Sequence, residues 1–367
     1  MHDYRSTDTY PTTPGEPARS LLRDHAAEAE NLRQLHKEQL DVIYRERWFR
    51  MFVPVSLGGP GLPLPDVLRT EEGIAFADGS TAWVVTLCSG AGWFAGFLDP
   101  HLAREIFSNE KACLAGSGAP SGRAEIRPNG FVVNGEWKYA TGALYATMFT
   151  ANCVITRDGV PVINPDGNPQ IKAFIFSRDE VLVRKSWSSM GMIATGSHQF
   201  LVKDLFVSST RAFTIDGAQA TFPDPIYQFP FMQLAETTLA VNFSGMALRF
   251  LELLRPLLEE RMFKDSSMRN DLIAIHESSV DTLRDCRKLF YQRVEESWSY
   301  CESVRKIPEA ILQDVSNISY KLYLTSLTQV NGVYRYSGMV AADPREELNR
   351  IWRNIHTASQ HTLFSTR

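Results

Sequence analysis

The stretch from Gly130 to Gly142, GFVVNGEWKYATG, brings together more side chains able to contact a ligand than any other part of the chain. Trp137 and Tyr139 alternate on a segment rich in β-forming residues, and Thr141 follows at its end. Asn134-Gly135 predicts a tight hairpin turn, because this pair adopts positive φ at low cost. Rings and a hydroxyl at a strand end can line a flat, hydrogen-bonding ligand such as a flavin. Packing of two aromatic side chains on one sheet face is the alternative interpretation.

Composition excludes several classes of function. The chain has 367 residues, of which 44% are hydrophobic and 22% charged, enough for a sizeable core. Its formal net charge of -4 argues against nucleic acid as a partner, since phosphate binding needs a basic surface. The long apolar stretch 74–98 is interrupted by Asp78 and several glycines, so we expect no membrane span.

The five cysteines favour a reducing compartment. They are scattered, without a CxxC pair, which predicts neither a zinc site nor a disulfide framework, and we expect no metal. Residues 1–17, with Pro11, Pro14 and Pro17, are typical of a flexible leader and lack the apolar segment of an export signal. We therefore expect a cytoplasmic protein.

The order of elements predicts an α+β fold in three units. Helical periodicity covers 18–48, 66–77 and 80–98, with a Pro/Gly-rich loop at 51–65 and a cap signal at Asp78-Gly79-Ser80. Short strands with turns at 128–130 and 165–167 follow, and then long helical segments near 234–261, 270–299 and 308–336, with a last helix from Glu346. These segments predict a leader at 1–17, a helical domain at 18–111, a β-domain at 112–215 and a four-helix bundle at 216–367.

Four segments in this order resemble the acyl-CoA dehydrogenase superfamily, and the resemblance extends from about Leu21 to His361. They are VPVSLGGPGLPLPDVLRTEEGIAFADGSTAW at 53–83, GSGAPSG with NGFVVNGEWKYATG within 116–142, WSSMGMIATGSHQFLVKDLFV at 187–207, and ELNRIWRNIHTASQH at 347–361. The resemblance implies a helical domain, a β-domain and a helical bundle that hold a flavin, either FAD or FMN, between them. It also implies a small-molecule substrate and a homotetramer or homodimer.

Within the superfamily, ADGSTAW and RIWRNIHTASQH are more similar to the branch of monooxygenases that receive reduced flavin from a separate reductase. That branch implies oxygenation of an aromatic or polyketide-like substrate. An acyl-CoA dehydrogenase with a displaced base is an alternative, because the glutamate base expected near the last helix is absent and only Asp343 lies close by. A fold relative that binds a ligand without catalysis is a second alternative.

The resemblance also assigns candidate site residues. It implies that Thr141 and its neighbours face the flavin, that Ser117 and Gly118 belong to the same wall, and that Thr195 and Ser197 lie on a loop touching the cofactor. His361 and Asn354 are the candidate catalytic residues, expected on one helix face with Arg350. Arg261, near Lys264 and Arg269, is implied to approach the flavin phosphate of a neighbouring subunit. The full cofactor set is Ser117, Gly118, Trp137, Tyr139, Thr141, Gly142, Thr195, Ser197 and Arg261.

Overall fold

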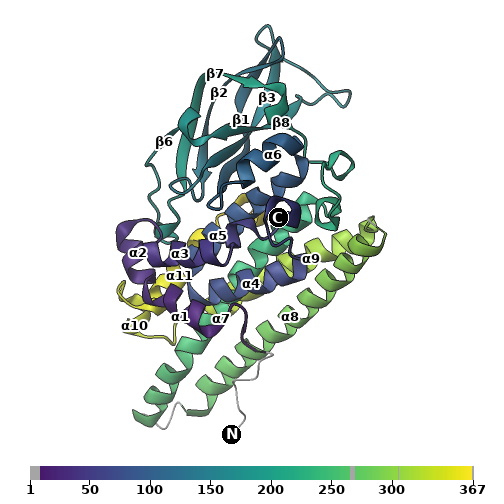
Figure 1. Ribbon diagram of the computed structural model, residues 1–367. Helices are drawn as coiled ribbons and strands as arrows, with labels where there is room; N and C mark the ends of the chain where they lie inside the picture. The colour runs from purple at the N-terminus through teal and green to yellow at the C-terminus, as the bar shows by residue number, and fades with distance from the viewer. Residues whose placement is uncertain (1–8, 265–268, 305, 366–367) are drawn as a thin grey trace.

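A computed structural model describes residues 9–264, 269–304 and 306–365, so residues 1–8 of the predicted leader lie outside the described part. Helices at the N-terminal end pack beneath a β-sheet, and long helices of the C-terminal half run diagonally below both (Figure 1). The first helices are α1 (Glu16–Asp24), α2 (Ala26–Leu32), α3 (Lys37–Arg45), α4 (Leu64–Ala77), α5 (Gly79–Gly92) and α6 (Pro100–Phe107).

The segment 18–48, expected to be helical, consists mainly of three short helices, because the chain breaks twice within it. His25 lies between α1 and α2, and Arg33 ends α2 in the left-handed region with φ 57°. His36 then starts α3 in extended conformation, with its side chain accepting from the Glu38 backbone nitrogen. These caps turn one periodic segment into three short helices.

The middle of the chain forms one mixed sheet. Its strands are β1 (Leu114–Arg127), β2 (Gly130–Ala140), β3 (Met148–Arg157), β4 (Val160–Pro161), β5 (Ile171–Ser177), β6 (Leu182–Arg184), β7 (His198–Ser208) and β8 (Ala212–Phe213). They are ordered β6-β7-β2-β1-β3-β5-β8, with β4 paired to β3, and β1 runs parallel to β3. Their inward side chains make a second core, separate from the helical one.

Asn134-Gly135 is not a hairpin turn, contrary to the expectation from sequence. The pair lies inside β2, where the pairing with β7 shifts register. A Cβ on Gly135 would come within 2.5 Å of the Trp137 ring and 2.7 Å of the Gly122 Cα. Glycine is needed here for close approach rather than for a turn. The β1–β2 turn falls at 128–129 instead, as predicted, with Asn129 at φ 61°.

The C-terminal half consists of the long helices α7 (Phe231–Lys264), α8 (Arg269–Ser303) and α9 (Glu309–Tyr334), then α10 (Met339–Ala342), α11 (Glu347–Ala358) and α12 (Thr362–Ser365). A buried ion pair joins the two helical parts: both Glu72 carboxylate oxygens of α4 accept from Arg287 of α8 at 2.8 Å. Tyr291 donates to the same carboxylate at 3.0 Å. One apolar core extends through both parts and reaches the sheet at Ile175.

The predicted divisions at 111/112 and 215/216 stay predictions, because that shared core crosses both. All five cysteines are buried, and none of them forms a disulfide. Among the described residues, no helix has the length and apolar character that crossing a bilayer requires.

Candidate functional site

A cavity of about 260 Å³ lies where α5, α7, the sheet and the C-terminal segment meet. Four of the predicted site residues line it, namely Ser117, Gly118, Thr141 and His361. The remaining wall is mostly apolar and aromatic, with few hydroxyls. It consists of Thr86, Leu87, Gly90, Ala91, Phe94, Gly116, Thr150, Ala151, Asn152, Ala173, Ile215, Phe231, Met232, Leu234, Ala235, Thr238, Leu239 and Leu363.

Three hydroxyls form a chain that ends at this cavity. Thr195 Oγ1 donates to the Met192 carbonyl at 2.8 Å and lies 2.7 Å from Ser197 Oγ, which is 2.8 Å from Thr141 Oγ1. A carbonyl oxygen only accepts, so the Thr195 hydrogen is committed to it, and Ser197 must donate to Thr195. Thr141 must then donate to Ser197. The Thr141 oxygen therefore offers the cavity only acceptor capacity.

The backbone around Thr141 is shaped to bring that oxygen to the wall. Tyr139 has φ 63° and Gly142 has φ 78°. Residues other than glycine seldom adopt this left-handed backbone conformation. A Cβ on Gly142 would lie 2.4 Å from the Cys88 sulfur on α5. The end of β2 is thus pressed against α5, and Gly142 permits that approach.

His361 also lines the cavity. Its ring meets Trp83 edge to face at 5.9 Å, and its Nδ1 accepts from the Leu363 backbone nitrogen at 3.3 Å. Burial lowers the pKa of His361 below the ordinary histidine value. The ring is therefore neutral near pH 7, with its hydrogen on Nε2, and can donate to a ligand.

The expectation that His361, Asn354 and Arg350 share a helix face is wrong, since α11 ends at Ala358 and His361 follows in the turn before α12. Asn354 does not line the cavity. Its Oδ1 accepts from the Met192 backbone nitrogen at 2.6 Å, which makes it a support for the connector, residues 185–197 between β6 and β7.

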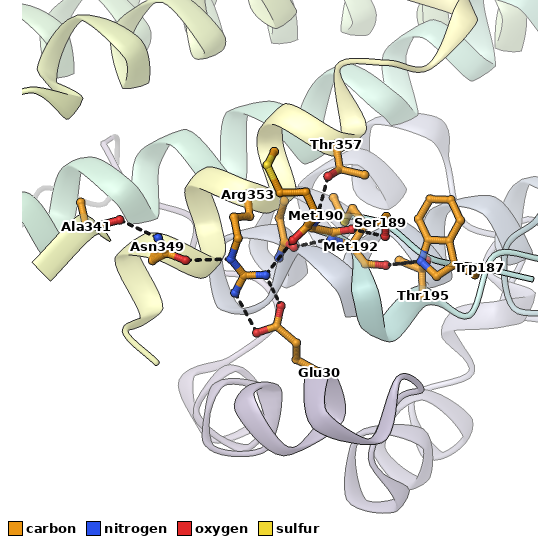
Figure 2. A network of polar contacts seen from close by, with 12 residues as sticks. Glu30, Trp187, Ser189, Met190, Met192, Thr195, Ala341, Asn349, Arg353 and Thr357 are labelled. Atoms are coloured by element: carbon orange, nitrogen blue, oxygen red, sulfur yellow. Dashed lines mark hydrogen bonds and ion pairs between the residues drawn. The ribbon is translucent and has the colours of Figure 1, made fainter. Parts of the chain in front are cut away.

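Figure 2 shows how α11 holds the connector. Thr357 accepts from the Gly191 nitrogen at 2.9 Å, and Arg353 donates to the Met190 carbonyl at 2.9 Å. Arg353 also forms an ion pair with Glu30 of α2. Gly191 is required here, because a Cβ would lie 2.1 Å from the Arg353 carbonyl oxygen. Segments that are distant in sequence thus fix the turn that carries Thr195 and Ser197.

Three predicted flavin contacts lie away from the cavity. Trp137 is 0% exposed, stacks on Phe200 at 5.1 Å and donates to the Asn152 carbonyl, so it is a core residue of the sheet. Tyr139 is 71% exposed and meets Trp187 edge to face on the outer surface. Arg261 donates to the Tyr336 carbonyl at 2.5 Å, far along α7. The side chains of Lys264 and Arg269 lie outside the described part.

The buried carboxylate of Glu71, near the cavity, was not among the site residues predicted from sequence. Glu71 of α4 is fully buried and accepts from Ser89 of α5 at 3.0 Å. Thr86, one turn before Ser89, lines the cavity and accepts from Asn242 of α7 at 2.9 Å. Burial raises the pKa of Glu71 to about 8. The only sequence signal is the polar character of α5 within an apolar segment.

The described residues include one group with metal-binding residue types, His25, Glu28 and His36. His36 Nδ1 accepts from the Glu38 nitrogen, which leaves its hydrogen on Nε2, facing Glu28 at 3.5 Å. An Nε2 that carries hydrogen has no lone pair for a metal. The group is therefore a helix cap with a carboxylate partner.

Comparison with known proteins places this architecture. Residues 237–366 match the family described as acyl-CoA dehydrogenase, C-terminal domain. The oxygenase subunit HsaA of a flavin-dependent monooxygenase from Mycobacterium tuberculosis is 23% identical over 93% of this chain and 88% of its own length. Indole-3-acetate monooxygenase from Pseudomonas putida is 26% identical over 94% of this chain and 88% of its own length.

Solved structures agree on the fold. The M. tuberculosis HsaA structure has a TM-score of 0.85 at 22% identity, covering 95% of this chain and 93% of its own. XiaF from Streptomyces, in complex with FADH2 and glycerol, has a TM-score of 0.82 at 19% identity, covering 95% of this chain and 89% of its own. The family match covers the C-terminal third of the chain, and the relatives named above are monooxygenases or their oxygenase subunits. The resemblance and the fold class inferred from sequence are confirmed.

Proposed function

We propose that this protein is the oxygenase component of a two-component monooxygenase, which binds reduced FMN or FAD and hydroxylates an aromatic substrate with O2. The observation that carries this proposal is the direction of the hydroxyl chain ending at Thr141. An acceptor at this wall suits the N5–H of a reduced flavin, whereas N5 of an oxidised flavin carries no hydrogen. The acceptor at Thr141 therefore fits the reduced cofactor.

Thr141 and Ser117 are the cavity residues that would hold the flavin edge, with Ser197 and Thr195 fixing the Thr141 hydroxyl from behind. When bound, reduced flavin supplies the electrons that activate O2. The chain itself contributes a largely apolar cavity that limits the access of water. The residues that would support the site without contacting the flavin ring are Trp137, Tyr139, Gly142 and Arg261.

The cavity favours an aromatic substrate over an acyl-CoA. At about 260 Å³ it lies near the lower end of the size of small-molecule pockets. Phe94, Phe231 and Leu239 offer flat, apolar contacts for a ring. Neutral His361 presents Nε2–H, which can donate to a ring hydroxyl or phenolate oxygen and orient the position to be oxygenated.

A dehydrogenase with a displaced base is disfavoured by the carboxylates. None of the described cavity-lining residues is Asp or Glu. Asp343, the proposed substitute, lies at an exposed turn, where Arg345 holds its pKa at about 2. Such a carboxylate is a poor general base. The non-catalytic alternative predicts flavin or ligand binding without oxygenated product.

We further propose a separate flavin reductase as partner, because relatives are named as oxygenase subunits or components. A homotetramer or homodimer and a cytoplasmic location complete the proposal. Five cysteines without a disulfide suit a reducing compartment. The exposed ring of Tyr139 suits an additional covering surface such as a second copy of the chain.

Anaerobic titration with reduced and with oxidised FMN and FAD tests the central claim. We expect tighter binding of the reduced form, by about tenfold for one hydrogen bond to a buried acceptor. Thr141→Val should lose this preference, whereas Thr141→Ser should keep it. Equal affinity for both redox states in the wild-type protein would refute the argument from the hydroxyl chain.

Turnover is then measured with an unrelated flavin reductase, NADH and a panel of phenols and indoles under ¹⁸O2. The expected result is product that carries one labelled oxygen. Flavin binding with no labelled product from any aromatic substrate would favour the non-catalytic alternative. Reduction of bound FAD by an acyl-CoA would favour the dehydrogenase.

A further inference from the structure

A second hollow, of about 580 Å³, lies between α2, the start of α11 and the connector. We call it the arginine groove, because Arg33, Arg345, Arg350 and Arg353 line it against one acidic residue, Glu30. Like charges gathered in this way repel one another unless a counter-charge is present. The pairing of each arginine therefore decides whether the groove is complete on its own.

Two of the four arginines have acidic partners. Arg353 pairs with Glu30, as Figure 2 shows, and Arg345 pairs with Asp343 at 2.6 Å. Among the described residues, Arg33 donates to one acceptor, the backbone carbonyl of Trp187, at 3.2 Å. Its positive charge is thus available to a ligand in the groove.

Arg350 is the decisive residue. It is 8% exposed, and the guanidinium makes no hydrogen bond or ion pair with any of the residues that the structure describes. Asp78 interacts with it electrostatically, but this carboxylate is buried and already accepts from Thr81 at 2.6 and 2.9 Å. A guanidinium that is nine-tenths buried with its donors unused is costly unless something else accepts from it.

We propose that the arginine groove binds a phosphorylated small molecule of about nucleotide size. Guanidinium groups bind phosphate oxygens in pairs, and Arg350 with Arg33 offers free donors for them. Ala27, Ile193 and Pro344 add apolar wall for a ring or sugar. The volume exceeds what a phosphate ion needs and lies within the range of small-molecule sites.

This site is distinct from the cavity near Thr141, although the connector joins them. Ile193 lines the groove, and Thr195, two residues later, belongs to the hydroxyl chain. The phosphate has two possible sources, the tail of the flavin itself or a separate nucleotide. The inference holds whether or not the protein is a monooxygenase, since it rests on the groove alone.

Calorimetric titration of the full-length protein with pyrophosphate and with ADP tests the proposal. We expect saturable binding with one site per chain, weakened by about tenfold or more in Arg350→Gln, because each charge-assisted hydrogen bond is worth that much. Arg284→Gln on α8, where the arginine is exposed and pairs with Asp281, is the matched control and should bind as the wild type does. Arg33→Gln should weaken binding without touching a buried group.

Repeating the titration with protein saturated with FMN or FAD separates the two sources. Loss of pyrophosphate binding would assign the groove to the flavin tail, and retained binding would assign it to a separate nucleotide. The proposal is overturned if neither probe binds saturably, or if Arg33→Gln and Arg284→Gln bind as tightly as each other and as the wild type. Circular dichroism of Arg350→Gln distinguishes lost folding from a lost site.

Discussion

The side-chain oxygen of Asn354 accepts a hydrogen bond of 2.6 Å from the backbone nitrogen of Met192, across 162 residues of sequence. Met192 in turn offers its carbonyl to Thr195 and to the Trp187 indole. The geometry of the candidate site therefore depends on a residue of α11 that does not touch the cavity. Asn354 acts as a positioning residue.

Replacement of Asn354 by alanine tests this dependence. The buried Met192 nitrogen would lose its acceptor, at a cost of about 1–3 kcal/mol, and we expect flavin affinity to fall by about tenfold. Asn349→Ala is the control, because Asn349 lies on the same helix and bonds Ala341 and Arg353 but not the connector. Equal losses in both variants, measured by flavin titration, would show a general effect of α11 instead.

Protonation of His361 should make the substrate KM depend on pH, with an acidic limb in which KM rises as pH falls. Because burial lowers its pKa, the ring stays neutral until pH falls below about 6.5, the ordinary histidine value. Protonation then places a charge in an apolar cavity and breaks the contact with Leu363, so KM should rise at lower pH. His361→Asn should lose this limb and form product about tenfold more slowly.

His356→Asn is the matched control for that experiment. His356 packs on Trp352 and contacts Asn331, outside the cavity lining. We expect its variant to keep the wild-type limb. A limb that persists in His361→Asn would assign the titration to another group.

Glu71 makes stability depend on pH in the direction opposite to most carboxylates. Its pKa is about 8 when folded and about 4.3 when unfolded, so the folded state holds the extra proton between these values. The stabilisation is complete below about pH 4.3 and is lost as pH rises toward 8. Glu71→Gln does not titrate.

We therefore expect urea unfolding of Glu71→Gln and of the wild type to agree near pH 4 and to diverge by pH 8, where the variant is more stable. Glu295→Gln, at an exposed site on α8, should follow the wild type at both values. Parallel pH profiles for wild type and Glu71→Gln would contradict the assignment.

The ion pair between Glu72 and Arg287 should contribute strongly to stability when one partner is removed. Arg287→Gln leaves a buried carboxylate with only hydroxyl donors, and we expect a loss of about 3–5 kcal/mol in the free energy of unfolding. Arg293 pairs with Glu296 on the same helix, with both side chains 44% exposed. Arg293→Gln should cost less than about 1 kcal/mol in the same urea titration.

Sequence reasoning reached the architecture because its signals are local. The long helices follow from 3.6-residue periodicity: α7 and α8 extend the expected segments by a few residues, whereas α9 is slightly shorter than expected. Thr141 was found because it ends a recognisable strand. The predicted turn at Asn134-Gly135 was wrong because turn propensity is a local property. Gly135 is needed for the close approach of the Trp137 ring, whose position depends on Phe200 from another strand.

Sequence patterns could not predict the residues that support the site without lining the cavity. Nothing local marks Asn354 as a partner of Met192, or Arg350 as a cation without an ion pair among the described residues, since both depend on how α11 docks. Glu71 and Glu72 are adjacent and both buried, and their partners, Ser89 for Glu71 and Arg287 for Glu72, distinguish their roles. Such roles follow from tertiary packing, which no periodicity encodes.

The buried state of all five cysteines has a practical consequence for studying the connector. Burial raises the pKa of Cys153 to about 12, and none of the thiols is at the surface. A cysteine introduced in place of Met190, which is 51% exposed beside Arg353, would be the one thiol open to a fluorescent maleimide. The native chain can thus be labelled at one position without removing any cysteine. The fluorescence of that label would report ligand binding on either side of the connector.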